Sequence, residues 1–342
     1  MFKPIKIGVF ALLITIFFIG CGDKKDNKTG NDSGSLRSKF IKKDSASGKE
    51  KIFLKYVPKK GDIFKYKLDL DAMQSENSPF TGDKEIAQNT NQVYYYTQEV
   101  MDINEKGIIT YKVKFDSIKI TIKQDTNSVF YNSNVNDSNR INPLFFSYSA
   151  VVGQPFKFRL NTDGKILELI ELDDIKASYM KLLPDTLSEK AKEKDYAQSF
   201  DPESLRGLME EELARFKSDY VPVDEPYQFT EDETLLVFKT KTTRQYKIGE
   251  IKEENGKLLV TIAGELNVEF ATREYIEKGE KMVLDNYETK GASSLTIDLA
   301  RGIIIKKEVN VPLNIDVSLS AKGQSVKVKR KNQKKAVLTL LN

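Results

Sequence analysis

The stretch YYYTQEVMDINEKGIITYKVKFDSIKITI, residues 94–122, decides the fold class. Both of its arms are rich in aromatic and β-branched residues, and residues 104–107 separate them with a polar sequence that ends in Gly107. After this turn, apolar and polar side chains alternate over residues 109–115, the period-two pattern of a strand with one buried face. The stretch therefore predicts a β-hairpin.

The apolar positions of the second arm change parity after Phe115. Ile118 and Ile120 follow at even positions, whereas the apolar residues before them stand at odd positions. A slip of one residue would turn a strand inside out, so a β-bulge is expected at Asp116 and Ser117.

Similar units occur on both sides of this hairpin. Residues 63–70 alternate in the same way, and a second long hairpin is expected over residues 248–270, around Gly256. Each long hairpin is followed by a short one between two glycines eleven residues apart, Gly153 and Gly164 early, Gly291 and Gly302 late. We interpret this as an internal duplication. The alternative is that antiparallel hairpins reuse glycine turns at similar spacing by chance.

A helical insertion is expected between the two β-rich parts. Asp201 followed by Pro202 is a strong signal for a helix start, and apolar residues then recur at helical spacing from Leu205 to Tyr220. Residues 210–212 are three consecutive glutamates that are expected on a solvated face, as are Asp173 and Asp174.

The predicted organisation has five parts. They are a lipoprotein signal peptide (1–20), a lipidated and disordered tether (21–50), a first β-rich half (51–170), the helical insertion (171–220) and a second β-rich half (221–342). The fold class is mainly β, a β-rich α+β arrangement of duplicated antiparallel sheets that are curved or half-barrel-like. At the level of architecture, this is similar to the half-barrels of periplasmic lipoprotein carriers.

The first 21 residues carry a targeting signal. Lys3 and Lys6 precede a run of 13 uncharged residues, 7–19, which is too short for the about 20 residues that span a bilayer. Gly20 and Cys21 follow, and Cys21 is the only cysteine of the chain. This pattern resembles the lipobox of bacterial lipoproteins, which implies cleavage between Gly20 and Cys21 and acylation of Cys21, with palmitate as one acyl chain. The alternative is an uncleaved anchor.

Missing residue types restrict the chemistry. The chain has no His and no Trp, so histidine-based nucleophiles, the commonest zinc ligand and the usual sugar-stacking ring are excluded. The formal net charge of +4 is too weak to argue for nucleic acid. We expect no enzyme activity, no cofactor, no metal and no nucleic-acid partner. A hydrolase that uses a Ser/Lys or carboxylate pair remains the less favoured alternative.

Aromatic side chains are the candidates for a ligand site. An apolar groove lined by Tyr94, Tyr96, Phe145, Phe146 and Tyr148 would suit a hydrophobic ligand. The competing interpretation is that these rings pack the helical insertion onto the sheet.

Two further segments have both a functional and a structural interpretation. The Asn-rich residues 132–139 offer oxygen atoms but lack the acidic ligands of a calcium loop. The basic residues within 327–335 could contact lipid phosphates, or could protect an edge strand from aggregation.

Residues 60–66, 152–158 leading to 163–166, and 294–298 before Gly302 resemble an uncharacterised lipoprotein family of Bacteroidota. The resemblance covers about residues 51–320. It implies secretion, lipidation and a β-dominated envelope domain, and it supplies no catalytic residues.

The sequence therefore predicts a non-catalytic lipoprotein of the cell envelope, held in the outer membrane through Cys21, on its periplasmic face or on the cell surface. It would act as a binding or interaction module for a hydrophobic or lipid ligand. The alternative is an envelope scaffold that recognises a protein or glycan partner.

Overall fold

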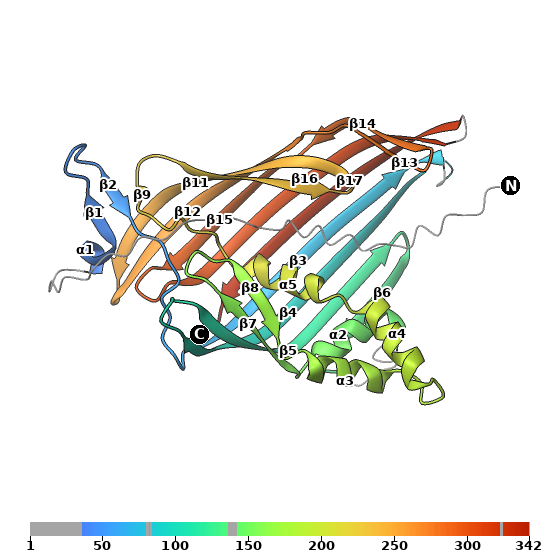
Figure 1. Ribbon diagram of the computed structural model, residues 1–342, viewed down its shortest axis with the longest axis horizontal. Coiled ribbons are helices and arrows are strands. Elements are labelled where there is room, and N and C mark those ends of the chain that lie inside the picture. Colours follow the sequence, from blue (N-terminus) through green and yellow to red (C-terminus); the bar gives the residue numbers. More distant parts are fainter. Residues whose placement is uncertain (1–35, 80–81, 83, 136–141, 322–323, 342) are drawn as a thin grey trace.

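The computed structural model describes residues 36–79, 82, 84–135, 142–321 and 324–341. Most of them belong to one open antiparallel sheet of 14 strands, whose long central strands cross Figure 1 diagonally. Neighbouring strands follow the order β10-β11-β12-β15-β16-β17-β3-β4-β5-β7-β8, and β13, β14 and β6 pair beside this path. The predicted fold class, mainly β with a helical insertion, is confirmed.

The strands of the large sheet differ widely in length. They are β3 (Ile63–Asn77), β4 (Glu85–Ile103), β5 (Ile109–Gln124), β6 (Asn127–Asn132), β7 (Pro155–Leu160), β8 (Ile166–Ile170), β10 (Tyr227–Leu235), β11 (Phe238–Glu254), β12 (Lys257–Phe270), β13 (Glu274–Glu277), β14 (Glu280–Glu288), β15 (Lys290–Asp298), β16 (Ile303–Ala321) and β17 (Gln324–Leu340). The helices are α1 (Leu36–Phe40), a 3-10 turn (Pro143–Phe145), α2 (Phe146–Val151), α3 (Asp173–Leu182), α4 (Glu189–Ser199) and α5 (Pro202–Glu212).

The predicted hairpin over residues 94–122 is formed by β4 and β5. Gly107 has a positive φ of 73° in the turn, and its N–H donates to the carbonyl of Asn104. The register shifts where Tyr95 faces Ser117 and Tyr96 faces Phe115, which leaves Asp116 as the extra residue. The expected β-bulge is therefore present, and it keeps Phe115 and Ile118 both buried.

The two β-rich halves are parts of one sheet. The last strand, β17, pairs with the first long strand, β3, from Lys329 opposite Asn77 to Leu340 opposite Tyr66. Within each half the pairing order is the same, because β4-β5-β7-β8 is matched by β11-β12-β15-β16. This repeated order agrees with the duplicated hairpins of the sequence.

The helical insertion is shorter than its apolar stripe predicts. The helix predicted to reach Tyr220 ends at Glu212, and Leu213 already has extended backbone angles. The main chain beyond Leu213 forms hydrogen bonds with other parts of the protein. The Ala214 N–H donates to the Tyr56 hydroxyl at 2.8 Å, and the Phe216 N–H donates to the Asp163 carbonyl at 2.9 Å. These contacts replace the hydrogen bonds that would continue α5.

The predicted disordered tether differs from the structure at its C-terminal end. From Leu36 onward the chain forms α1 and a three-stranded sheet of β1 (Ile41–Lys43), β2 (Glu50–Ile52) and β9 (Val221–Pro222). Ile41, Ile52 and Val221 are buried there, although the segment contains few apolar residues. A few well-placed apolar side chains are enough because β9 supplies a partner strand.

The C-terminal basic run was expected at an edge strand, and this is wrong. β17 pairs with β16 on one side and β3 on the other, so its lysines stand on a central strand. Pro312 lies within β16 although proline has no N–H to donate to a neighbouring strand. It lies where β16 changes partner from β15, at Asn310, to β14, at Asn314, so no ladder hydrogen bond requires its N–H.

The sheet curves along its strand order, with α5 inside the curve and α2, α3 and α4 grouped beside β5 and β6 in Figure 1. The main apolar core fills the space between these helices and the concave face, and a smaller cluster around Phe238, Leu284 and Ile315 lies farther along the sheet. Within the described residues, no helix combines the length and apolar character needed to cross a bilayer.

Candidate binding groove on the concave face

A groove lies on the concave face beside the C-terminal half of α5. Its volume is about 180 Å³. Strands as far apart in the sheet order as β4 and β11 contribute to it, which is possible only because the sheet curves. The apolar part of its floor is formed by Leu70, Leu266, Leu295, Val309, Val311 and the ring of Tyr246. We call this the concave groove.

The register of the sheet places these side chains on one face. Ala72 on β3 lies opposite Lys334 on β17, which in turn lies opposite Val311 on β16. Residues directly opposite each other across antiparallel strands point to the same side of a sheet. Lys334 therefore projects into the groove from its floor, next to apolar neighbours.

Glu211, Lys334 and Lys307 form a charged cluster at the end of α5. Lys334 Nζ pairs with the Glu211 carboxylate, and Lys307 Nζ donates to the main-chain carbonyls of Glu211 at 2.8 Å and Leu213 at 2.5 Å. Burial disfavours the charged form of Glu211, but Lys334 and Lys307 outweigh it and lower the pKa of that carboxyl. Burial lowers the pKa of Lys307 to about 8. Lys307 thus caps the negative end of α5.

Glu212 lies beneath the groove in the core, with only 3% of its surface exposed. The Tyr96 hydroxyl donates to one carboxylate oxygen, and Gln98 Nε2 donates to the other at 3.0 Å. Burial raises the pKa of Glu212 to about 7, although both hydrogen bonds favour the ionised form. The side chain is therefore an acid that titrates near neutrality inside an apolar core.

Glu210 borders the groove with an incompletely satisfied carboxyl group. Its Oε2 atom is buried and has no hydrogen-bond partner among the described residues. Burial raises the pKa of Glu210 to about 7, opposed by the nearby charges of Arg206 and Arg215.

On the opposite side of the groove, Arg244 is 96% buried and is held by two acidic residues. Its guanidinium donates to Glu231 and Glu233, each at 2.9 Å. The charge of this arginine is thus largely balanced within the sheet.

The groove combines an apolar floor with a few polar groups, and two titratable groups next to it are engaged by the protein itself. The amine of Lys307 is occupied by two carbonyls, and Glu212 is enclosed by Tyr96 and Gln98. In the part of the chain that the structure describes, no group of three or more acidic or cysteine side chains is arranged to hold a metal ion.

The five aromatic residues predicted to line a groove lie in the core instead. Tyr94 and Tyr96 contact Phe115, and Phe145 stacks on Tyr131 with ring centroids 5.1 Å apart. Phe146 packs edge-on against Tyr179 of α3, and the Tyr148 hydroxyl accepts from Gln92 Nε2 at 3.3 Å. None of the five lines the concave groove. Their packing of the helices onto the sheet corresponds to the competing interpretation.

Other predicted sites have different outcomes. Gly20 and Cys21 lie outside the described residues, as does part of the Asn-rich segment. Asp173 and Asp174 are exposed as expected. The solvated face predicted for the three glutamates is wrong, because Glu212 is buried and Glu211 is held by lysines.

The sequence contains a signal for the burial of Glu212. Glu212 stands seven residues after Leu205 and three after Met209, so helical spacing puts it on the buried stripe. Lys307 and Lys334 carried no such signal, because only the tertiary fold brings them to α5.

Taken together, the fold and the groove define a mainly β protein whose open, curved sheet holds a ligand-sized groove against a helical insertion. The chain belongs to a family of unknown function, DUF6263, whose model matches residues 106–304. The matched region runs from the β4–β5 turn into β16, and it contains α5 with its three glutamates.

Several solved structures have a distantly similar arrangement. A lipovitellin structure, titled for its lipid–protein interactions, matches at 9% identity with a TM-score of 0.45, covering 83% of this chain and 25% of that chain. DynF from the dynemicin biosynthesis pathway of Micromonospora chersina matches at 9% identity and a TM-score of 0.16, covering 83% of each chain. Pseudomonas aeruginosa OccK5 (OpdH) matches at 6% identity and a TM-score of 0.24, covering 82% of this chain and 99% of that chain.

The chain thus spans about a quarter of the length of the lipovitellin chain. No curated protein sequence matches it. All three structural likenesses are below a TM-score of 0.5, so none of them indicates a function for this chain.

Proposed function

We propose that this protein is a non-catalytic, lipid-anchored binding protein of the cell envelope that holds the apolar part of a hydrophobic or lipid ligand in the concave groove. The observation that carries the proposal is an apolar floor left open to a ligand beside α5, next to the packed main core. Apolar pockets with a few convergent polar groups are the usual form of small-molecule sites.

The size of the groove suits an apolar group of modest length. An engineered apolar cavity of about 150 Å³ in another protein binds benzene, so 180 Å³ accommodates a ring or a segment of an acyl chain. Polar or charged parts of the ligand would lie toward Lys334 on the floor and Glu210 at the border.

The proposal of a binding rather than a catalytic role is supported by the state of the candidate groups. Ser293 and Lys307 both line the groove, but the Lys307 amine donates its hydrogen bonds to main-chain carbonyls at the end of α5. The chain also has no histidine to act as a base. A hydrolase would need a free nucleophile–base pair in this place.

Anchoring through Cys21 is the second half of the proposal, and it is tested separately. Cells that express the full chain or its Cys21→Ser variant are grown with radiolabelled palmitate and fractionated. We expect label and membrane association for the wild type only. Equal membrane association of both, without label on either, would contradict the anchor.

The ligand half is tested with the chain from residue 22 onward, which retains every described residue. Native mass spectrometry of the protein purified from bacterial cells is expected to show a bound small molecule, and cis-parinaric acid, a fluorescent fatty acid, should bind to the emptied protein. Val311→Trp fills the groove floor and should weaken probe binding at least tenfold. Asn310→Trp adds the same ring to the neighbouring exposed position and should leave binding unchanged.

A wild type that carries no small molecule and binds no probe would refute the ligand half. Equal loss of binding in both tryptophan variants would place the probe outside the groove.

A further inference from the structure

Positive charge is concentrated in one segment of the chain. Residues 36–60 contain nine Lys or Arg and two Asp or Glu, a net charge of +7, whereas residues 61–342 contain 40 and 45, a net charge of −5. Residues 217–225, which run beside this segment through β9, add one lysine and three acidic residues. The two segments together still carry +5.

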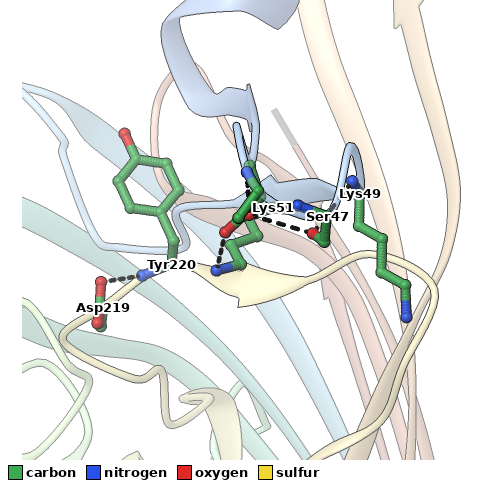
Figure 2. Close-up of polar contacts among 7 residues, drawn as sticks. Ser47, Lys49, Lys51, Asp219 and Tyr220 are labelled. Atoms are coloured by element: carbon green, nitrogen blue, oxygen red, sulfur yellow. Dashed lines mark hydrogen bonds and ion pairs between the residues drawn. The ribbon is translucent and has the colours of Figure 1, made fainter.

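The fold gathers most of this segment, residues 36–52, at one end of the molecule. α1, β1, β2 and β9 form a small unit at the left of Figure 1, away from the β13–β14 end of the sheet. The apolar side chains of Ile41 and Ile52 point into the core, so the charged residues between them are left at the surface. Figure 2 shows Lys49 and Lys51 beside Ser47 and Tyr220 on this unit.

Only some of these cations are paired. Arg37 contacts Glu50 at 2.8 Å, Lys51 contacts Asp44 at 2.6 Å, and Lys49 pairs with Glu225. Five lysines of the segment have no acidic partner among the described residues; they are Lys39, Lys42, Lys43, Lys55 and Lys59. We call these five the N-terminal basic surface.

Two aromatic rings accompany the basic surface. Phe53 and Tyr220 stack with their centroids 5.2 Å apart, and both are only partly buried. Lys42 Nζ lies 4.9 Å from the centre of the Tyr220 ring, and Lys55 Nζ lies 5.0 Å from that of Phe53. Lysines and partly exposed aromatic rings together are the side chains that suit the headgroup region of a bilayer.

We propose that the N-terminal basic surface binds the anionic headgroups of a lipid bilayer and holds this end of the sheet against the membrane. Charge complementarity is the first argument, since clustered lysines near a membrane attract anionic lipids. The second argument rests on the proposed anchor: the 14 residues 22–35 span at most about 50 Å, so an acyl chain on Cys21 keeps Leu36 and the basic surface within that distance of the bilayer.

The test uses the unacylated chain from residue 22 onward, so its result does not depend on Cys21. Binding is measured by co-sedimentation with vesicles of phosphatidylcholine alone or mixed with 30% phosphatidylglycerol. The wild type is expected to bind the anionic vesicles only, and to be released at 0.5 M salt because screening is strong there. Removing one lysine near a bilayer weakens partitioning about fivefold.

A quadruple variant removes four charges from the basic surface: Lys39→Gln, Lys42→Gln, Lys43→Gln and Lys59→Gln. We expect at least a tenfold loss of vesicle binding. The matched control removes four exposed charges from the opposite end of the sheet, with Lys123→Gln, Lys239→Gln, Lys241→Gln and Lys278→Gln, and should bind like the wild type. If the first variant unfolds, the double variant Lys39→Gln/Lys59→Gln touches no aromatic ring and serves instead.

Three results would overturn the proposal. They are a wild type that does not bind anionic vesicles, an equal loss of vesicle binding in both quadruple variants, and vesicle binding that persists at 0.5 M salt. Binding that persists at high salt but is lost in Val311→Trp would assign the vesicle contact to the concave groove, so the two proposals fail separately.

Discussion

Replacing Glu212 by glutamine should make the protein more stable at alkaline pH and leave it unchanged at acidic pH. The folded carboxyl has a pKa of about 7, against an ordinary value of 4.5 in the unfolded chain. Between these values the unfolded chain releases its proton while the folded chain retains it, so stability falls as the pH rises through this window. A difference of about 2.5 units corresponds to about 3 kcal/mol above pH 7, and glutamine removes this loss.

The free energy of unfolding is measured in urea at pH 4 and pH 8, followed by circular dichroism because the chain has no tryptophan. We expect Glu212→Gln to match the wild type within about 0.5 kcal/mol at pH 4, below the ordinary pKa of a glutamate, and to exceed it by about 3 kcal/mol at pH 8. Glu253→Gln changes an exposed glutamate and should show no such difference. A variant whose stability relative to the wild type is the same at both pH values would show that Glu212 is ionised in the core, and the reasoning would fail.

Two further substitutions test how the chain is held around α5. Lys334→Ala removes the ammonium partner of the Glu211 carboxylate from a pair that is about four-fifths buried, so it should lower the free energy of unfolding in urea at pH 7 by about 2 kcal/mol. Lys331→Ala, whose pair with Glu85 is exposed, should change that free energy by under about 0.5 kcal/mol. Equal changes in the free energy of unfolding for the two substitutions would show that the Lys334–Glu211 pair does not stabilise the fold. Gly164→Ala would place a Cβ atom 2.0 Å from the Ala214 carbonyl oxygen at a φ of 85°, and should lower the free energy of unfolding by about 3 kcal/mol. Gly153→Ala has a similar φ of 77° but open space around the new Cβ, and should lower it by about 1 kcal/mol. Thermal unfolding measures both.

Local patterns were enough to predict the strands and their turns. The alternation through Phe115 and its change of parity at Ile118 required a bulge at Asp116, because both residues had to remain on the buried face. Gly107 and Gly256 marked two hairpin turns for a local reason as well, since both adopt a positive φ that other residues avoid. These features depend on a few neighbouring residues, and the sequence contains all of them.

Features that depend on distant contacts were missed. The stripe from Leu205 to Tyr220 favours a longer helix, but hydrogen bonds that the main chain beyond Glu212 donates to Tyr56 and Asp163 hold it in an extended form. The groove was placed at aromatic residues because large rings are the usual lining of ligand sites. The sheet instead curves so that Leu70, Val309 and Tyr246, from three separate strands, line one cavity. No local pattern records that curvature.

The groove and the buried glutamates meet at the same point of the fold, and this has a consequence for both. The C-terminal end of α5 is fixed to the sheet mainly by charge: Lys307 holds its carbonyls, Lys334 holds Glu211, and Tyr96 holds Glu212. A purely apolar contact could slide along the sheet at little cost, but directional hydrogen bonds to three different strands cannot. The same residues therefore fix the position of the groove wall, and an apolar floor can stay open beside the helix instead of being closed by it.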